Sequence, residues 1–299
     1  MKSVIPLFLI ILPAIIFQAC ADGSHTTVTA PKPFNLRFHA SLSDRLRDVT
    51  CTTPLTRLGT SGVQGKLLDL AFFIHKLEFI KADGQVVTAE LSEDEWQSQG
   101  VALLDFQDKS DSCSGEDKPT NTSIRGLIAN DETFTQVRFT LGIPPALNHV
   151  DPASVKAPLN APNMFWSWQG GYKAMRFDVS PENGITRPGD PNFFGSNFFF
   201  HLGSTDCVGD PIAGQSVSCG RVNQAVITLD GFSLGSSEVI LDLETLVSDL
   251  NLQVDTFDTP GCMSSTVDPE CQSYFEKLGM DLQLGASMPS IPQSAFRLK

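Results

Sequence analysis

Two tryptophans stand one residue apart in the segment NMFWSWQGGYK, which spans residues 163–173. In an extended strand Trp166 and Trp168 share one face, because side chains alternate with a period of two. Aromatic side chains supply much of the buried area of folded proteins, so packing in the core is the first interpretation. A stacking platform for a sugar, or a redox-modified site, is the alternative. Met164 falls on the same face, and a thioether near imidazoles suits Cu(I).

Histidine, the commonest metal ligand and acid–base side chain, is scarce in this sequence. No pair has HxH, HExxH or HxxxH spacing, so a metal site must be assembled from segments far apart in the chain. His39 lies on the polar face of a predicted strand, His149 follows PPALN, and His201 ends an aromatic run. Taken singly, each is most simply a hydrogen-bonded structural histidine.

Signatures of common enzyme classes are missing from the sequence. It contains no GxSxG nucleophile elbow, no phosphate-binding loop, no dinucleotide fingerprint and no CxxCH haem site. Glu93, Asp94 and Glu95 resemble a helix start rather than a catalytic carboxylate pair. The formal net charge of −13 argues against binding nucleic acid and against electrostatic docking on anionic lipid. We therefore expect a binding protein and not an enzyme.

The first residues have the pattern of an export signal. One lysine precedes the apolar run of residues 4–17, which is too short to span a bilayer. The run ends in FQAC, which resembles a bacterial lipobox with Cys20 as the lipidated residue, although an ordinary signal peptide cleaved nearby is the alternative. We predict a signal peptide at 1–19 and a polar tether at 20–33 that includes His25. The protein is then exported, either periplasmic or anchored to the outer membrane by its lipid.

The cysteine count agrees with this leader. An exported protein with seven cysteines has an odd one to explain, and Cys20 explains it. The remaining six can form three disulfides in an oxidising compartment, and none has the CxxC spacing of a zinc or redox site. Many pairings remain open to six cysteines. Pairing close neighbours first gives Cys207–Cys219 and Cys262–Cys271, which leaves Cys51–Cys113.

Strand patterns dominate the rest of the chain. Residues 34–40, FNLRFHA, alternate apolar and polar side chains. Residues 67–80 form a long apolar segment, followed by a DG turn and VVTAEL. On this segment His75 is expected to share a face with Phe73, Leu77 and Phe79 and to be buried and neutral. Further strands are predicted at 134–143, 174–179, 196–204 and 224–232.

Helical patterns are few. Short helices are predicted at 92–98, 243–250 and 268–279, the last with Pro at its first position and Gly at its end. Many strands together with 23 glycines and 19 prolines predict an all-β fold, an antiparallel β-sandwich with long decorated loops and a few short helices. No linker-like break interrupts residues 34–299, which we expect to form a single domain.

Five ordered stretches match the motifs of a known family. They are ALLDFQD (102–108, with Cys113 after it), VRFTLGIPPALNH (137–149), PLNAPNMFWSWQGGYK (158–173), FFFHLGSTDC (198–207) and GCMSSTVDPEC (261–271). In this order, over residues 34–279, they resemble the MbnP-like family, also called the metallo-mystery pair four-Cys motif proteins. One such stretch alone would be weak, whereas the ordered set is specific.

The resemblance implies a periplasmic copper-binding protein with a role in copper homeostasis. In that family a dihaem partner of the MauG or cytochrome c peroxidase type, MbnH, oxidises the first tryptophan of a WxW motif to kynurenine, and Cu(I) binding depends on the change. Here that tryptophan is Trp166, and Trp168 completes the motif. An indole offers no σ lone pair to a metal, whereas the opened ring carries an aryl amine whose nitrogen can coordinate.

The resemblance also implies ligands among the histidines. His149 in LNH and His201 in HLGST match family motifs, and His39 is a third candidate because of its polar-face position. The predicted copper ligands are therefore these three histidines and the modified Trp166. A competing hypothesis is a carbohydrate- or surface-binding β-sandwich lipoprotein that uses Trp166 and Trp168 as an aromatic platform. A secreted hydrolase is weaker, because no nucleophile or acid pair stands near a histidine in the sequence.

Overall fold

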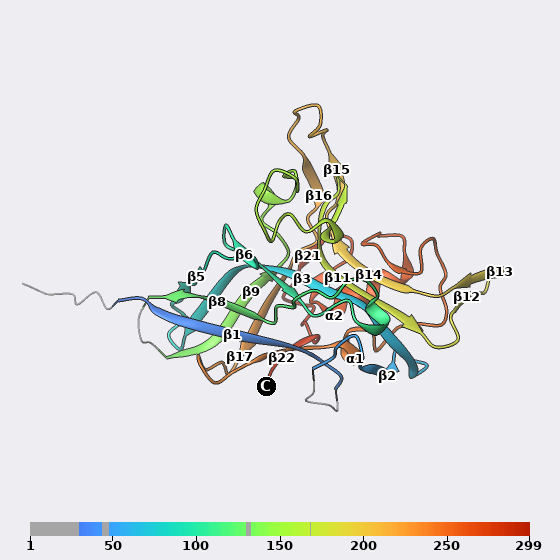
Figure 1. Cartoon of the computed structure of the whole chain (residues 1–299), viewed down its shortest axis with the longest axis horizontal. Helices are drawn as coiled ribbons and strands as arrows, with labels where there is room; N and C mark the ends of the chain where they lie inside the picture. Colours follow the sequence, from blue (N-terminus) through green and yellow to red (C-terminus); the bar gives the residue numbers. More distant parts are fainter. Residues whose placement is uncertain (1–29, 44–47, 130–132, 168) are drawn as a thin grey trace, which may run out of the picture.

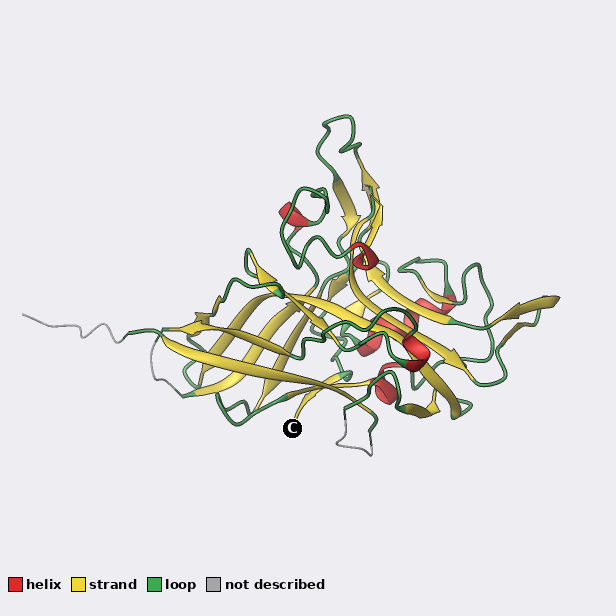
Figure 2. Ribbon diagram, in the orientation of Figure 1, coloured by secondary structure: helices red, strands yellow, loops and turns green. Residues whose placement is uncertain are grey.

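The computed structural model describes residues 30–43, 48–129, 133–167 and 169–299. The predicted signal peptide, Cys20, His25 and Trp168 lie outside these residues. Two large β-sheets form the body, and only short helices accompany them in the described chain (Figure 2). None of the helices among these residues is long and apolar enough to cross a membrane. The all-β prediction is confirmed.

The smaller sheet has five strands in the order β22-β18-β1-β8-β5. Strand β1 is central, pairing antiparallel with β8 and parallel with β18. Phe34, Leu36 and Phe38 are buried on one face of β1, as its alternating sequence predicts. The bounds are β1 Lys32–Ser41, β5 Glu90–Leu91, β8 Ser123–Ile128, β18 Val239–Asp242 and β22 Phe296–Leu298.

The larger sheet has eleven strands built around the long strand β3. Its main path runs β17-β9-β3-β11-β14-β19, and shorter strands pair along β3, β7 and β11. The main-path bounds are β3 Val63–Lys81, β9 Phe134–Leu141, β11 Gly171–Pro181, β14 Phe198–Gly203, β17 Ala225–Asp230 and β19 Gly261–Cys262. The shorter strands are β2 Pro54–Leu58, β4 Val86–Thr88, β6 Gln97–Ser98, β7 Val101–Asp105 and β10 Phe165–Ser167.

The main core lies between the two sheets. Phe38 of β1 meets Phe72 of β3 and Phe139 of β9, with ring centroids 6.3 and 5.6 Å apart. Phe177 and Phe200, from neighbouring strands of the larger sheet, stack in the same core. Each such side chain contributes roughly 1.5–3 kcal/mol when it leaves water. The sandwich is thus held mainly by contacts between its inner faces.

A second, smaller core covers part of the outer face of the larger sheet. Phe73 and Tyr172 project from that face and pack with Leu159 and Met164 of the connection between β9 and β10. The Tyr172 hydroxyl donates a hydrogen bond to the carbonyl of Leu159 and so fixes the connection. Two short 3-10 helices in this connection are η2 Pro145–Leu147 and η3 Pro162–Met164. This layer determines where the next residues, those of β10, approach the sheet.

Short hairpins and helices complete the fold. Strands β15 and β16 form a hairpin that projects from the body at the top of Figure 1, and β12 and β13 form another at its side. The bounds are β12 Ile185–Arg187, β13 Asp190–Gly195, β15 Thr205–Val208, β16 Ser218–Arg221, β20 Met280–Asp281 and β21 Ala286–Ser287. The helices are α1 Leu243–Leu246, α2 Pro269–Lys277 and the 3-10 turn η1 Asp111–Cys113.

The helix predictions met mixed outcomes. Helix α2 begins after its N-cap Asp268, whose carboxylate accepts from the backbone of Glu270, and α1 is shorter than predicted. The helix predicted at 92–98 is wrong, because the segment forms turns and strand β6. Asp94 accepts a hydrogen bond from its own neighbour Trp96, 2.7 Å away, which stabilises a turn rather than a helix.

Three disulfides join the described cysteines in the pairs expected from neighbour spacing. The structure contains Cys51–Cys113, Cys207–Cys219 and Cys262–Cys271. The first and third lie in the main core, whereas the second crosses the projecting β15–β16 hairpin.

Candidate metal centre

His201 and Gly203 face outward from the larger sheet near its β11–β14 pair. Phe200 and Leu202, which alternate with them along β14, point into the main core. In the register with β11, His201 lies opposite Arg176. Polar residues of β14 and β11 therefore gather on the outer face of the sheet.

The imidazole of His201 is buried and held from one side. Its Nε2 donates a hydrogen bond to Oδ1 of Asp178, 2.8 Å away. Nδ1 is buried and has no hydrogen-bond partner among the residues that the structure describes. Burial lowers the pKa of His201, although the hydrogen bond to Asp178 opposes that effect. The geometry fits a neutral imidazole whose Nδ1 lone pair is available to a ligand.

The indole of Trp166 lies beside this histidine. Strand β10 pairs with β11, which places Ser167 opposite Gly171. The ring centroids of Trp166 and His201 are 6.2 Å apart, and the indole is half-buried. A Cβ on Gly203 would come within 2.5 Å of Cζ3 of Trp166, so the six-membered ring can lie here only because residue 203 is glycine. The HLG sequence thus supplies an imidazole and the space for an indole on one face of β14.

A charged network continues from His201 across β11 to β3. Oδ2 of Asp178 accepts from Nε of Arg176 at 2.6 Å, and Arg176 Nη1 lies 3.1 Å from Oδ2 of Asp69. Burial raises the pKa of Asp69 to about 6 against the lowering effect of Arg176, and burial lowers the pKa of Lys173 to about 8. Beside this network lies a pocket of about 320 Å³ whose lining includes Asp69, Arg176 and Asp178. The acidic partner of His201 is therefore itself fixed by a cation.

His149 lies near the same end of β14, on the connection after η2. The Asn148 side chain donates to Oγ of Ser204 at 3.1 Å and accepts from the backbone N of Tyr172. Ser204 directly follows Gly203, so these bonds hold the segment that carries His149 against the end of β14. Nε2 of His149 lies 3.4 Å from Sγ of Cys219 and 3.2 Å from Nδ2 of Asn148. His149 and Cys219 also line a pocket of about 150 Å³.

His39 does not join this group. It alternates with the core residues Phe38 and Ala40, so it faces outward from the smaller sheet, on the opposite side of the sandwich from His201. Its Nδ1 contacts the carboxylate of Asp48, and its Nε2 lies 3.1 Å from Oε2 of Glu238. The expectation that His39 shares a copper site with His201 is therefore wrong, because the core separates them.

Comparison with known proteins identifies the family. A family model for MbnP matches residues 31–264. The chain belongs to the MbnP family. Among solved structures, MbnP from Methylosinus trichosporium is similar with a TM-score of 0.81 and 28% sequence identity, covering 90% of this chain and 99% of that chain. No curated protein sequence matches the chain significantly.

Met164 of this MbnP-family chain belongs to the second core and not to the metal centre. It is fully buried in η3 among Leu159, Tyr172 and their neighbours. The idea that Met164 and Trp166 share one face of a strand fails, because Met164 belongs to η3 and β10 begins only at Phe165. Trp168 lies outside the described residues.

Two residues at the site were not predicted from the sequence. Asp178 holds His201, and Gly203 makes room for Trp166. Once the structure is known, both positions can be recognised in the sequence. Asp178 is a polar residue between core residues of β11, and Gly203 stands two positions after His201 on the same face. Alternation identifies such positions, but only the strand pairing shows which ones meet.

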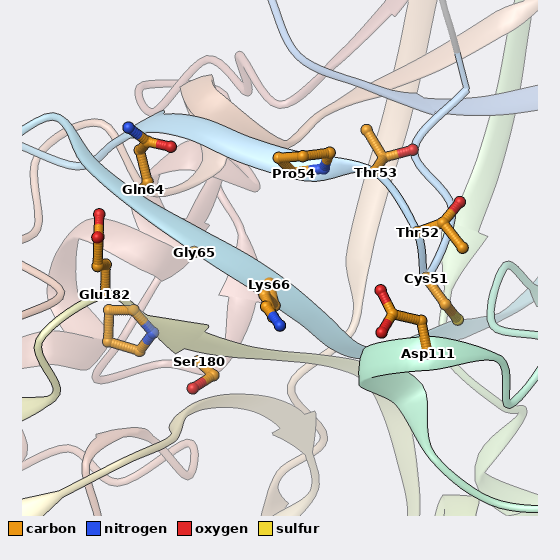
Figure 3. Close-up of a pocket in the computed structure, with 11 residues that line it drawn as sticks. Cys51, Thr52, Thr53, Pro54, Gln64, Gly65, Lys66, Asp111, Ser180 and Glu182 are labelled. Atoms are coloured by element: carbon orange, nitrogen blue, oxygen red, sulfur yellow. The ribbon is translucent and has the colours of Figure 1, made fainter.

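A further pocket lies away from this site. It has a volume of about 350 Å³ and lies at the Pro181 end of β11, whereas Trp166 lies near the Gly171 end. Figure 3 shows its lining side chains coming from the segment before β2, from β2, β3 and η1, and from the end of β11 and the residue after it. Apart from the disulfide residue Cys51, it contains none of the predicted site residues.

Proposed function

We propose that this protein binds copper as Cu(I) at the outer face of the larger sheet and that it is not an enzyme. The observation that carries the proposal is the buried Nδ1 of His201, which has no hydrogen-bond partner among the described residues, while Nε2 is hydrogen-bonded to Asp178. Metal-binding histidines commonly have this arrangement, in which a carboxylate on one nitrogen fixes the ring and the other nitrogen coordinates. Imidazole nitrogen is a suitable ligand for copper.

Trp166 supplies the second ligand after oxidation to kynurenine. An intact indole has no σ lone pair, so the ring must lose one carbon and gain one oxygen before its nitrogen becomes an aryl amine. Its place beside His201 and over Gly203 supports this role. His149 is the candidate third ligand, because the Asn148 hydrogen bonds hold its segment at the same end of β14. The chain's own residues thus orient two imidazoles and one modified ring.

Maturation requires a partner that removes electrons from Trp166. By family resemblance we propose a dihaem enzyme of the MauG or cytochrome c peroxidase type. The half-buried indole supports this assignment, since part of the ring stays reachable from outside. We further propose that the protein is an exported lipoprotein attached through Cys20, with a periplasmic role in copper homeostasis.

The experiment compares variants made together with the dihaem partner. Wild type, Trp166→Phe, His201→Ala and the control His39→Gln are titrated with Cu(I) against a chromophoric chelator. We expect Trp166→Phe and His201→Ala to lose copper binding. His39→Gln should retain it, because the core separates His39 from the proposed centre. Peptide mass spectrometry should show that Trp166 has lost one carbon and gained one oxygen.

Two results would overturn parts of the proposal. Full copper binding by wild-type protein with unmodified Trp166 would refute maturation. Unchanged copper binding by folded His201→Ala would refute this placement of the metal. A carbohydrate platform has less support, because Gly203 and His201 already cover part of the Trp166 ring.

A further inference from the structure

The Cys207–Cys219 disulfide differs from the other two in its surroundings. The remaining disulfide cysteines, Cys51, Cys113, Cys262 and Cys271, are 2%, 5%, 0% and 0% exposed and belong to the main core. Cys207 and Cys219 are half-buried and join strands of a hairpin that projects from the body (Figure 1). A dithiol in solution therefore reaches this bond first, and breaking it leaves the core contacts in place.

The two sulfurs remain neighbours whether or not they are bonded. Cys207 lies directly opposite Cys219 in the β15–β16 ladder, flanked by the pairs Thr205–Arg221 and Val208–Ser218. The ladder thus holds the cysteines in register. Asn223 also anchors the base of the hairpin, since its Nδ2 donates to the Gly203 carbonyl at 2.7 Å.

An imidazole lies against this pair. Nε2 of His149 is 3.4 Å from Sγ of Cys219, and the ligand atoms of His149, Cys207 and Cys219 all lie within 4.8 Å of one another. His149 and Cys219 also line the pocket of about 150 Å³, where the other lining side chains are neutral, among them Asn148 and Ser204. Two sulfurs and one nitrogen at this spacing form a soft donor set once the sulfurs are thiolates.

We propose that Cys207, Cys219 and His149 form a second, redox-gated site for Cu(I). A dithiol reductant breaks the Cys207–Cys219 bond. Two electrons and two protons pass to the cysteine sulfurs, and the reductant closes its own disulfide. Metal binding then displaces the thiol protons. Metal–thiolate bonds of about 2.3 Å need the sulfurs to separate by only about 2 Å from their bonded positions, which side-chain rotation can supply.

This second site shares only His149 with the proposed Trp166 centre. It uses neither Trp166 nor His201, and it forms only in reduced protein. In oxidised protein, the sulfurs are bonded to each other, and only the proposed centre at Trp166 would use His149 as a ligand. The redox state of one hairpin disulfide would therefore decide which copper site includes His149.

The first test asks which disulfide a reductant opens. Folded protein made without the dihaem partner is treated with dithiothreitol, alkylated and mapped by peptide mass spectrometry. We expect alkylation at Cys207 and Cys219 before any of the core cysteines. Alkylation of the core pairs first, or of none before unfolding, would overturn the proposal.

The second test measures copper on the same protein after anaerobic removal of the dithiol. Reduced protein should bind one more equivalent of Cu(I) than oxidised protein, and a thiolate-to-metal absorption band should accompany binding of Cd²⁺. Cys207→Ser/Cys219→Ser should lose the extra equivalent. His149→Ala should weaken it by more than the roughly 10–100-fold typical of losing an outer partner of a ligand. His39→Gln is the matched control.

Controls keep this result separate from the Trp166 centre. Wild-type protein alkylated at both hairpin cysteines replaces the double variant if the latter fails to fold. An extra equivalent that survives alkylation, or that His149→Ala leaves unchanged, would overturn the three-residue site. The result does not depend on Trp166, because protein made without the partner retains an intact indole.

Discussion

Gly203→Ala tests whether the close approach of indole and strand builds the copper centre. The added Cβ would lie 2.5 Å from Cζ3 of Trp166 and about 3 Å from two further ring carbons. Ordinary carbon contacts are about 3.5–4.0 Å, so the ring has to retreat by about 1 Å. Forcing the methyl into a rigid site would cost roughly 1–3 kcal/mol. Because Trp166 is half-buried, we expect it to swing outward instead.

The expected loss is therefore in copper affinity and not in stability. A site functions when its groups are held to within about 0.5 Å, and this displacement is twice that. We expect the variant, made with the dihaem partner, to bind Cu(I) at least about tenfold more weakly, or about 1.4 kcal/mol. Competition with a chromophoric chelator measures the affinity, and denaturant unfolding measures the stability.

Gly189→Ala is the matched control. It lies in the β12–β13 turn, where a Cβ meets no atom within 4 Å, so the same chemical change should leave copper affinity unaltered. The reasoning would be refuted if folded Gly203→Ala converted Trp166 and bound copper as tightly as wild type. The contact between the ring and Gly203 would then be packing without a role in the centre.

Three other predictions follow from the same geometry. Asp178→Asn should weaken Cu(I) binding about 10–100-fold, because His201 loses its carboxylate partner. Titration of the folded variant with Cu(I) measures the loss, and an unchanged affinity would contradict the prediction. Met164→Leu should leave copper binding intact and cost under about 1.5 kcal/mol in unfolding experiments, since the thioether lies in the second core; loss of copper would make it a ligand. Burial raises the pKa of Asp69 from 3.8 to about 6, so wild-type stability falls relative to Asp69→Asn as pH rises from about 4 to 7. The free energy of unfolding of Asp69→Asn minus that of wild type should grow by up to about 3 kcal/mol over this pH range. A difference that does not change with pH would disprove the raised pKa.

Strand patterns in the sequence predicted which side chains face the core, but they did not predict where the alternation along a strand is interrupted. On β1, alternation assigned the core residues, and the structure confirms them. On β3, His75 was expected to share a face with Leu77 and Phe79. Lys76 instead has φ of 53°, and the pairing with β9 shifts register between His75 and Glu78. Leu77 and Phe79 therefore join the main core, while His75 bonds Gln224 outside it. A single irregular residue reverses the face, and composition does not reveal it.

For the candidate site, the sequence likewise did not predict which residues from distant strands meet. Alternation correctly placed His39 on a non-core face, but it could not say that this face belongs to the other sheet. Trp166 and His201 meet because β10 pairs with β11 and β11 pairs with β14. Asp178 reaches His201 through that same pairing. Such meetings depend on strand order, which short sequence windows do not contain.

The charges around His201 explain why this place would suit a soft monovalent ion better than a hard divalent one. Both oxygens of Asp178 are engaged, one by His201 and the other by Arg176. Asp69 has a raised pKa and also faces Arg176, while Lys173 adds another cationic group to the same outer face. Hard cations such as Ca²⁺ need several oxygen ligands, and these carboxylates are already held by cations. A neutral imidazole on a charge-balanced network would instead give Cu(I) a nitrogen ligand without an excess of negative charge to attract hard ions.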